Sequence, residues 1–136
     1  MKQALRILID IFQPDGIDWM NFTLSKSNPY TFHHIVEKSR GGEKKVDNGA
    51  ILTKNAHVFL NKLQRVCPDA YNDLQAVFAK INGTKQPVTD DIVNEIDEIL
   101  KKVLVTHEYE FTEDIDLMPY CDHYYKGKRK SKKCLK

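Results

Sequence analysis

The chain lacks long apolar runs and is poor in cysteine, and each lack removes a class of protein. No apolar stretch among its 136 residues approaches the roughly 20 residues that a membrane-spanning helix needs. Its three cysteines, Cys67, Cys121 and Cys134, are odd in number and widely spaced, which argues against a disulfide framework and a paired-cysteine zinc motif. With 41% hydrophobic and 29% charged residues, the composition is typical of one globular domain with reduced thiols.

A secretory signal pattern is also lacking. The first residues, MKQALRILIDIF, form an apolar stretch that Arg6 and Asp10 interrupt, and no small-residue cleavage site follows. We therefore expect a cytoplasmic location and no membrane partner.

Acidic residues are missing from the last eleven positions. Residues 126–136, KGKRKSKKCLK, contain seven Lys or Arg, whereas the first 125 residues contain 14 basic and 19 acidic side chains. The formal net charge of +2 therefore hides an acidic body and a strongly basic tail. Such a tail is either a solvated flexible end or a contact for phosphate groups, since each Lys or Arg that neutralises a phosphate releases counterions.

Apolar residues recur at helical spacing in four segments. They predict helices at about 3–13, 55–66, 68–82 and 89–104. Asn55 is placed to cap the second helix, which is expected to end near Cys67. Pro68 suits the first turn of the next helix, and Gly83 is expected to stop it. We expect the apolar faces of the last two helices to be core that carries no chemistry.

Short apolar, partly β-branched runs predict strands. They lie at Phe32–Val36 and Ala50–Thr53, and the alternating HEYEF at 107–111 predicts a third. About a dozen residues connect the first two strands, and loops of that length are typically functional or disordered.

Five side chains that suit chemistry fall in one pattern across these strands and the next helix: His33, His34, Asn48, His57 and Asn61. The four-residue spacing of the last two sets them on one helix face, one turn apart. If the strands fold back on that helix, a strand histidine comes opposite His57. Two imidazoles and an amide oxygen would then hold a cation and leave coordination positions for water and substrate.

The segment HHIVEKSRGGEKKVDNGAILTKNAHVFLN, residues 33–61, resembles the motif of HNH nucleases. The likeness rests on the strand-borne histidine pair, two glycines in the loop, Asp-Asn before the second strand, and a helix histidine nine residues after that Asn. It implies an α+β fold with a ββα-metal, or His-Me finger, core over about 31–65 and flanking helices. Together with the charge distribution, it gives one nuclease domain at 1–125 and a basic flexible tail at 126–136. The small size and the single motif suit the type that phages and mobile elements encode.

The resemblance implies a role for each of the five side chains. His33 and His57 correspond to metal ligands, and Asn61 stands where some members supply a third, commonly a histidine. His34 falls on the general base, and Asn48 on the residue that pins the long loop and helps to hold the base. The implied cofactor is one divalent ion, with Mg or Mn preferred and Ni or Zn as alternatives. Because neighbours on a strand point to opposite faces, His33 and His34 are not both expected to face the helix.

The implied function is metal-dependent endonucleolytic cleavage of DNA, with RNA the less favoured partner. Hydrolysis of a phosphodiester needs a base for the attacking water and positive charge near the oxygens, which neutral His34 and a cation would supply. A free imidazole titrates near pH 6.5, so cleavage is expected to rise through about that pH. A nucleic-acid-binding module with little catalysis and an RNase stay as alternatives. Basic side chains that either contact phosphates or form a solvated rim are Lys38, Arg40, Lys44, Lys45, Lys54, Lys128, Arg129, Lys130, Lys132 and Lys133.

Overall fold

The computed structural model describes residues 3–111, in which helices and one pair of strands follow one another. The elements are α1 (Gln3–Phe12), β1 (Tyr30–His34), η1 (Lys38–Arg40), η2 (Val46–Asn48), β2 (Gly49–Thr53), α2 (Lys54–Val66), α3 (Pro68–Thr84) and α4 (Asp90–Thr106), where η marks a 3-10 turn. This mixture of helix and strand is the predicted α+β class. No helix within residues 3–111 is long and apolar enough to cross a membrane. Outside the described residues lie the predicted tail contacts Lys128, Arg129, Lys130, Lys132 and Lys133.

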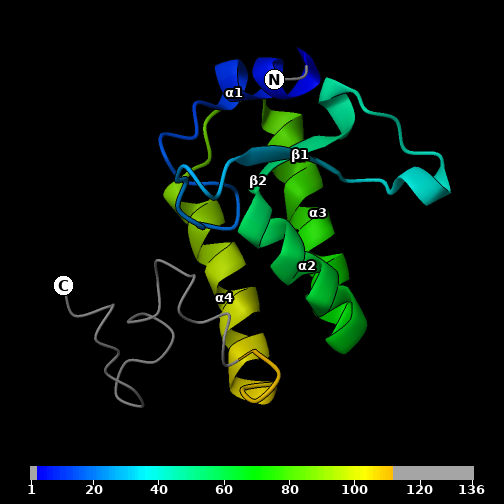
Figure 1. Ribbon diagram of the computed structural model, residues 1–136, viewed down its shortest axis with the longest axis vertical. Helices are drawn as coiled ribbons and strands as arrows, with labels where there is room; N and C mark the ends of the chain where they lie inside the picture. Colours follow the sequence, from blue (N-terminus) through cyan, green and yellow to red (C-terminus); the bar gives the residue numbers. More distant parts are fainter. Residues whose placement is uncertain (1–2, 112–136) are drawn as a thin grey trace.

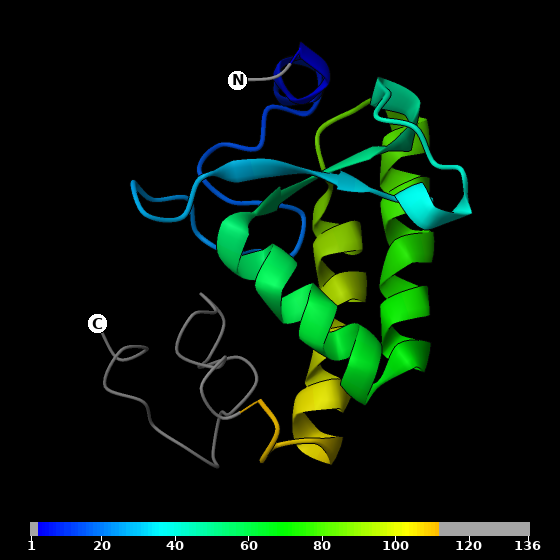
Figure 2. The same ribbon diagram turned by 45° about the vertical axis from the view of Figure 1, so that its right-hand side comes forward.

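The two strands form an antiparallel sheet between two layers of helix. α1 lies on one side of the sheet, and α2, α3 and α4 lie on the other (Figure 1, Figure 2). α1 packs on the strands through a buried stripe of Leu5, Leu8 and Phe12. On the other side α2 follows β2 directly, and α3 packs against both α2 and α4. A side chain of β1 therefore points either towards α1 or towards α2 and α3.

The pairing of the strands decides which β1 residues face which layer. Thr31 and His33 share the face towards α2, where both contact one residue of that helix. Phe32 and His34 share the other face. A Cβ added to Gly49 would lie 2.5 Å from the Phe32 ring and 2.5 Å from an α1 side chain, which places Phe32 on the α1 side. The sheet therefore separates His34 from His33.

β1 begins and ends two residues before the predicted strand Phe32–Val36. It begins earlier because backbone pairing continues beyond Tyr30, with the Lys54 N–H donating to the Pro29 carbonyl at 2.9 Å. It ends earlier because the Val36 N–H donates to the Asn48 side chain at 2.7 Å instead of to a strand.

α2 begins one residue before the predicted cap. Thr53 is the capping residue, and its hydroxyl accepts from the Ala56 N–H at 3.3 Å. The prediction that Asn55 caps this helix is therefore wrong. The Asn55 N–H instead donates to the Asn28 side chain at 2.7 Å, a contact with the loop before β1 that holds the start of α2.

α3 begins with Pro68 in its first turn, as predicted. Its end differs from the prediction, because the helix continues through Gly83 to Thr84 and Lys85 takes the left-handed conformation, with φ of 51°. The Lys85 ammonium is held by two oxygens of Asn82, both at 2.7 Å. This local capping supports a conformation that the sequence pattern assigned to glycine.

Residues 107–111 form a turn, so the predicted third strand is wrong. The His107 N–H donates back to the Val103 carbonyl at 2.7 Å, and the Phe111 N–H donates to the His107 carbonyl at 3.3 Å. The Phe111 ring is buried against Phe59, with ring centroids 5.1 Å apart. The alternation of HEYEF therefore reflects one anchored aromatic residue and not a strand face.

A buried carboxylate ties the loop before β1 to the start of α2. Asp18 accepts from the N–H groups of Met20 and Phe22 at 2.8 and 2.9 Å, and from the N–H and hydroxyl of Thr53, both at 2.7 Å. Burial raises the pKa of Asp18 to about 6, although these donors act to lower it. The junction between the hairpin and α2 is thus fixed from within the core.

Candidate metal centre

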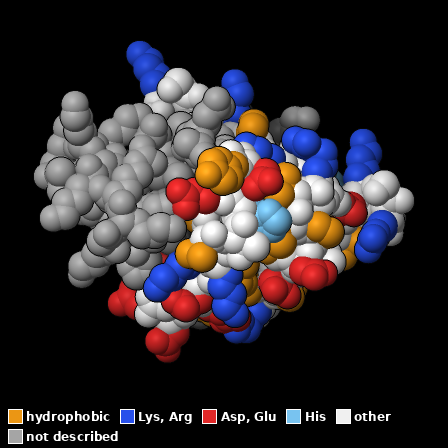
Figure 3. Space-filling view, turned by 90° about the horizontal axis from the view of Figure 1, so that it is seen from below, with side chains coloured by type: hydrophobic (Ala, Val, Ile, Leu, Met, Phe, Trp, Pro, Cys, Tyr) orange, Lys and Arg blue, Asp and Glu red, His pale blue; other side chains and the backbone are white. Residues whose placement is uncertain are grey.

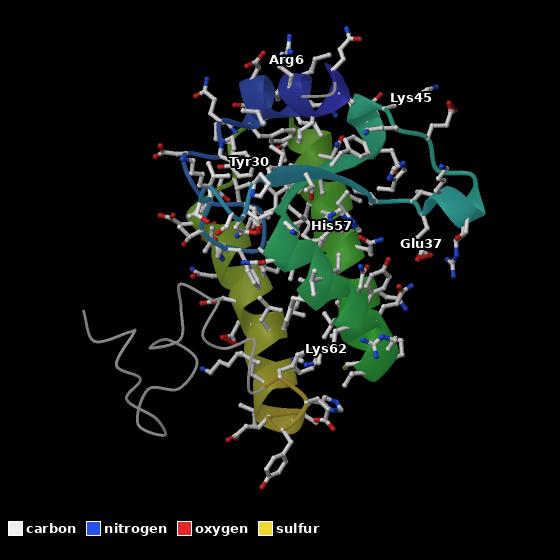
Figure 4. All side chains as sticks on the ribbon, viewed as in Figure 1. Arg6, Tyr30, Glu37, Lys45, His57 and Lys62 are labelled. Carbon is white, nitrogen blue, oxygen red and sulfur yellow. The ribbon has the colours of Figure 1, made fainter. Side chains whose placement is uncertain are left out.

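Two of the predicted metal ligands meet between the hairpin and the helices. His33 Nδ1, on β1, lies 3.2 Å from His57 Nε2, on α2, and the ring centroids are 5.1 Å apart. His33 is buried and His57 is half-buried. Figure 4 shows His57 near the start of α2, beneath the hairpin. The structure thus brings together side chains that are 24 residues apart in the chain.

The His57 nitrogen that faces away from His33, Nδ1, carries the hydrogen of the neutral ring. His57 Nδ1 lies 2.8 Å from the Thr31 hydroxyl oxygen. That hydroxyl donates its single hydrogen to the Leu52 carbonyl at 2.7 Å, so towards His57 it accepts. The neutral ring of His57 is therefore protonated at Nδ1 and bare at Nε2.

Likewise, the His33 nitrogen that faces away from His57, Nε2, carries the hydrogen of its neutral ring. His33 Nε2 lies 2.7 Å from Oε1 of Gln75, on α3. An amide oxygen only accepts, so Nε2 donates and the neutral ring is bare at Nδ1. The Phe78 ring packs edge-on against His33, with centroids 5.7 Å apart, and encloses the ring on the α3 side.

The two nitrogens that face each other are therefore both bare, and two lone pairs directed at each other repel unless a positive charge lies between them. Burial lowers the pKa of His33 to about 4 and lowers the pKa of His57, so both rings are neutral at pH 7. Nitrogens bound at about 2.1 Å to one divalent ion lie about 3.0 Å apart as octahedral neighbours and about 3.4 Å apart in a tetrahedron. The observed separation of 3.2 Å falls between these values. The pair fits a divalent cation, and the outer hydrogen bonds are those that orient metal-bound imidazoles.

The third predicted ligand, Asn61, is not part of this pair or of its hydrogen bonds. It is exposed on α2, one turn beyond His57. Within residues 3–111, no three His, Cys, Asp or Glu side chains are placed so that they could hold one metal ion together. A cation at this site would be held by His33 and His57, with oxygens of water or substrate completing its coordination.

His34 lies on the α1 side of the hairpin. Its ring packs edge-on against Phe32, with centroids 5.0 Å apart. Burial, together with the nearby charges of Lys44 and Lys38, holds the pKa of His34 below the ordinary 6.5. His34 is therefore neutral at pH 7 and partly accessible, as a general base must be, but it points away from the face that carries His33.

Asn48 holds the loop between the strands. Its Oδ1 accepts from the Val36 N–H at 2.7 Å, and its Nδ2 donates to the carbonyls of Val36 and Glu43, both at 3.0 Å. Gly42 lets this loop close, because an added Cβ would lie 1.8 Å from the Val36 carbonyl oxygen. These bonds fix the backbone two residues beyond His34.

Basic side chains surround this loop. Those exposed around it are Lys38, Arg40, Lys44 and Lys45, whereas Lys54 is exposed at the start of α2, beside the other end of β1. Arg40 lies 3.6 Å from the Glu37 carboxylate, and Lys45 lies 3.2 Å from Glu43. Figure 4 places Lys45 beside η2, towards α1.

The opposite end of the molecule, where α2 passes into α3, is seen from below in Figure 3. It carries basic and acidic side chains intermixed.

Two residues that orient the imidazoles were missed in the sequence. Thr31 lies two positions before His33, so the strand period alone places it on the same face. Gln75 lies 42 residues beyond His33, on a helix that was expected to carry only core. Its contact depends on how α3 packs against the hairpin, which no local pattern specifies.

Comparisons with protein-family models, with curated proteins and with solved structures give no match for this chain. A functional conclusion therefore depends on the geometry above and on the motif at residues 33–61.

Proposed function

We propose that the chain is a metal-dependent endonuclease of the HNH type that hydrolyses phosphodiester bonds in DNA. In this proposal β1, β2 and α2 form the ββα-metal unit, and α1, α3 and α4 support it. The observation that carries the proposal is the pair of bare imidazole nitrogens, 3.2 Å apart, at the strand and helix positions of the motif. Ordinary core histidines would satisfy each other through one N–H, whereas here both hydrogens are directed outwards.

Four of the five motif residues then have a task. His33 and His57 would hold a divalent ion, whose positive charge would offset the negative charge that develops on the phosphate oxygens. Neutral His34 accepts a proton from the attacking water while the water oxygen bonds to phosphorus. Asn48 restrains the backbone beyond His34 and so limits the movement of the base. The bond from phosphorus to the 3′ oxygen breaks, and that oxygen takes a proton from solvent water. The products are a 5′-phosphate and a 3′-hydroxyl, the usual products of this type of enzyme.

The opposite directions of His33 and His34 constrain where the substrate lies. Within the described residues, β1 pairs with β2 along one edge only. Side chains on either face of β1 can reach a phosphate that lies along its unpaired edge, so we place the scissile bond there. Lys38 and Lys44 are near enough to His34 to lower its pKa and would contact the adjoining phosphates.

Cleavage of supercoiled plasmid tests the proposal. The purified protein is incubated with Mg²⁺, Mn²⁺, Ni²⁺ or Zn²⁺ and then with EDTA. We expect nicked or linear DNA with at least one of these ions, loss of cleavage with EDTA, and recovery when the ion is added in excess. Intact plasmid and intact structured RNA with all four ions would contradict the proposal.

Three histidine variants separate the tasks of the residues. His34→Ala is expected to abolish cleavage and to retain metal binding, whereas His57→Ala is expected to weaken metal binding itself. His107→Ala is the matched control, because that ring lies at the end of α4, 3.6 Å from Glu110, and remote in sequence from the motif. Equal loss of metal binding from the first two variants would contradict this division of tasks.

A nucleic-acid-binding module without catalysis is the second candidate function. The observation that favours it is the position of His34 on the opposite face of the sheet from His33. It predicts metal binding and DNA binding without cleavage under any of the four ions. Cleavage of structured RNA but not plasmid in the same assay would identify an RNase instead.

A further inference from the structure

Gln75 makes three hydrogen bonds: two join α3 to His33 of β1 and to the residue after β1, and one stays within α3. Its Oε1 accepts from His33 Nε2 at 2.7 Å, and its Nε2 donates to the Ile35 carbonyl at 2.7 Å and to the Tyr71 hydroxyl at 3.1 Å. A reversed amide would set its oxygen against the Ile35 carbonyl, which only accepts. The orientation of the amide is therefore fixed by contacts other than the histidine.

A carboxylate at the far end sets the direction of the whole chain of hydrogen bonds. The Tyr71 hydroxyl donates to Glu37 at 3.1 Å, so its oxygen is left to accept from Gln75. The Gln64 side chain donates to the same carboxylate at 2.8 Å and, with Tyr71 and the charge of Arg40, lowers the pKa of Glu37. Burial and the adjacent Glu37 raise the pKa of Tyr71 to about 12. Glu37 is thus ionised and Tyr71 protonated at pH 7. The chain of hydrogen bonds therefore runs from His33 through Gln75 and Tyr71 to Glu37, and each group donates to the next. Figure 4 shows Glu37 beyond the end of β1.

We propose that Gln75 is a positioning residue for the cation site: by accepting the hydrogen of His33 Nε2, it keeps His33 Nδ1 bare and directed at His57 Nε2. This inference rests on the metal site of the proposed function. Without an acceptor at position 75, His33 carries its hydrogen on Nδ1 and donates it to His57 across the present 3.2 Å separation. The two imidazoles then satisfy each other, and a metal ion must displace that hydrogen bond before it binds.

Replacement of Gln75 by Met tests the inference, because Met keeps the length of the side chain and removes the amide. Nitrogen–hydrogen NMR of the imidazoles in metal-free protein reports which nitrogen carries the hydrogen. We expect His33 to be protonated at Nε2 in the wild type and at Nδ1 in Gln75→Met. Calorimetric titration with Zn²⁺ is expected to give an affinity about 10- to 100-fold lower for the variant, the range typical when a partner of a metal-bound histidine is removed.

Gln64→Met is the matched control. It makes the same substitution at a glutamine that contacts Glu37 but not a histidine, and the Ile35 carbonyl still orients Gln75. We expect it to keep the wild-type protonation of His33 and the wild-type Zn²⁺ affinity. Gln75→Glu keeps an acceptor for His33 Nε2 but loses the donor to Ile35 and Tyr71, so its readout is the protonation of His33 and not the affinity: we expect His33 to stay protonated at Nε2.

Two results would overturn the inference. One is a folded Gln75→Met protein with His33 still protonated at Nε2 and with unchanged Zn²⁺ affinity. The other, which applies even if Gln75→Met does not fold, is His33 protonated at Nδ1 in metal-free Gln75→Glu, where an acceptor for Nε2 is still present. Plasmid cleavage by the wild type is measured separately. The predicted NMR and Zn²⁺ results without cleavage would support the role of Gln75 and contradict the endonuclease proposal. Cleavage by the wild type, with His33 protonation and Zn²⁺ affinity unchanged in Gln75→Met, would support the endonuclease and contradict the role of Gln75.

Discussion

Asn48→Ala removes the side chain that ties the loop between the strands to the end of β1. Three hydrogen bonds disappear with it, one from the Val36 N–H at 2.7 Å and two to the carbonyls of Val36 and Glu43 at 3.0 Å. Each is worth roughly 0.5 to 1.5 kcal/mol, and the lower part of that range applies because water replaces the side chain at this accessible place. We therefore expect the free energy of unfolding to fall by about 1 to 2 kcal/mol, which lowers Tm by about 3 to 8 °C for a chain of this size.

The functional effect is expected to exceed the loss of stability. The loop beyond His34 is released, whereas the His33–His57 pair keeps its own partners, Thr31 and Gln75. Cleavage should therefore fall steeply at a temperature where the variant is fully folded, while its Zn²⁺ affinity stays within about twofold of the wild type. Urea unfolding followed by circular dichroism, calorimetric Zn²⁺ titration and plasmid cleavage measure the three quantities on one preparation.

Amide hydrogen exchange locates the effect. The Val36 N–H should exchange much faster in Asn48→Ala, because its acceptor is the removed side chain. Asn72→Ala, at an exposed position of α3, is the control and should change stability by less than about 0.5 kcal/mol. Wild-type protection of Val36, or parallel loss of cleavage and metal affinity, would refute the assignment of Asn48 to the loop.

Charged and titratable groups give three further predictions. Because burial and two lysines lower the pKa of His34, cleavage should rise with pH to a plateau with a midpoint below 6.5, and a rate that shows no fall at any pH below 6.5 at which the protein stays folded would count against His34 as base. Burial raises the pKa of Asp18 from 3.8 to about 6, so its contribution to stability is complete below pH 3.8 and is lost as pH rises through about 6. The wild type should therefore lose about 2 to 3 kcal/mol relative to Asp18→Asn between about pH 4 and pH 7 in urea unfolding, and parallel pH profiles would contradict this. Deletion of residues 126–136 should weaken DNA binding and flatten its salt dependence, by about 0.9 in logarithmic slope for each phosphate that the tail neutralises; an unchanged slope would mean that the tail neutralises none.

The helices could be predicted because their signals are local. The apolar stripes of α1, α3 and α4 repeat within each segment, and Pro68 marks the start of α3 without reference to the rest of the chain. The residues that cap the helices were harder to predict from the sequence. Thr53 and Asn55 are both good capping residues, and only the end of the strand ladder with β1 decides between them.

Part of the candidate site was also predictable. The spacing of His33 and His57 places one imidazole on a strand and the other on the next helix, and the structure brings them to 3.2 Å. The partners of these rings depend on tertiary packing instead. Gln75 reaches His33 only because α3 returns against the hairpin, so its role could not be read from a stripe of core residues.

The central claim is that His33 Nδ1 and His57 Nε2 are both bare and take up one divalent cation between them. Nitrogen–hydrogen NMR of the imidazoles during titration with Zn²⁺ tests this most directly. We predict that the metal-free protein carries hydrogens on His33 Nε2 and His57 Nδ1, and that one equivalent of Zn²⁺ shifts the resonances of the two facing nitrogens. A hydrogen on either facing nitrogen before Zn²⁺ is added, or no shift of these two resonances at saturation, would contradict it.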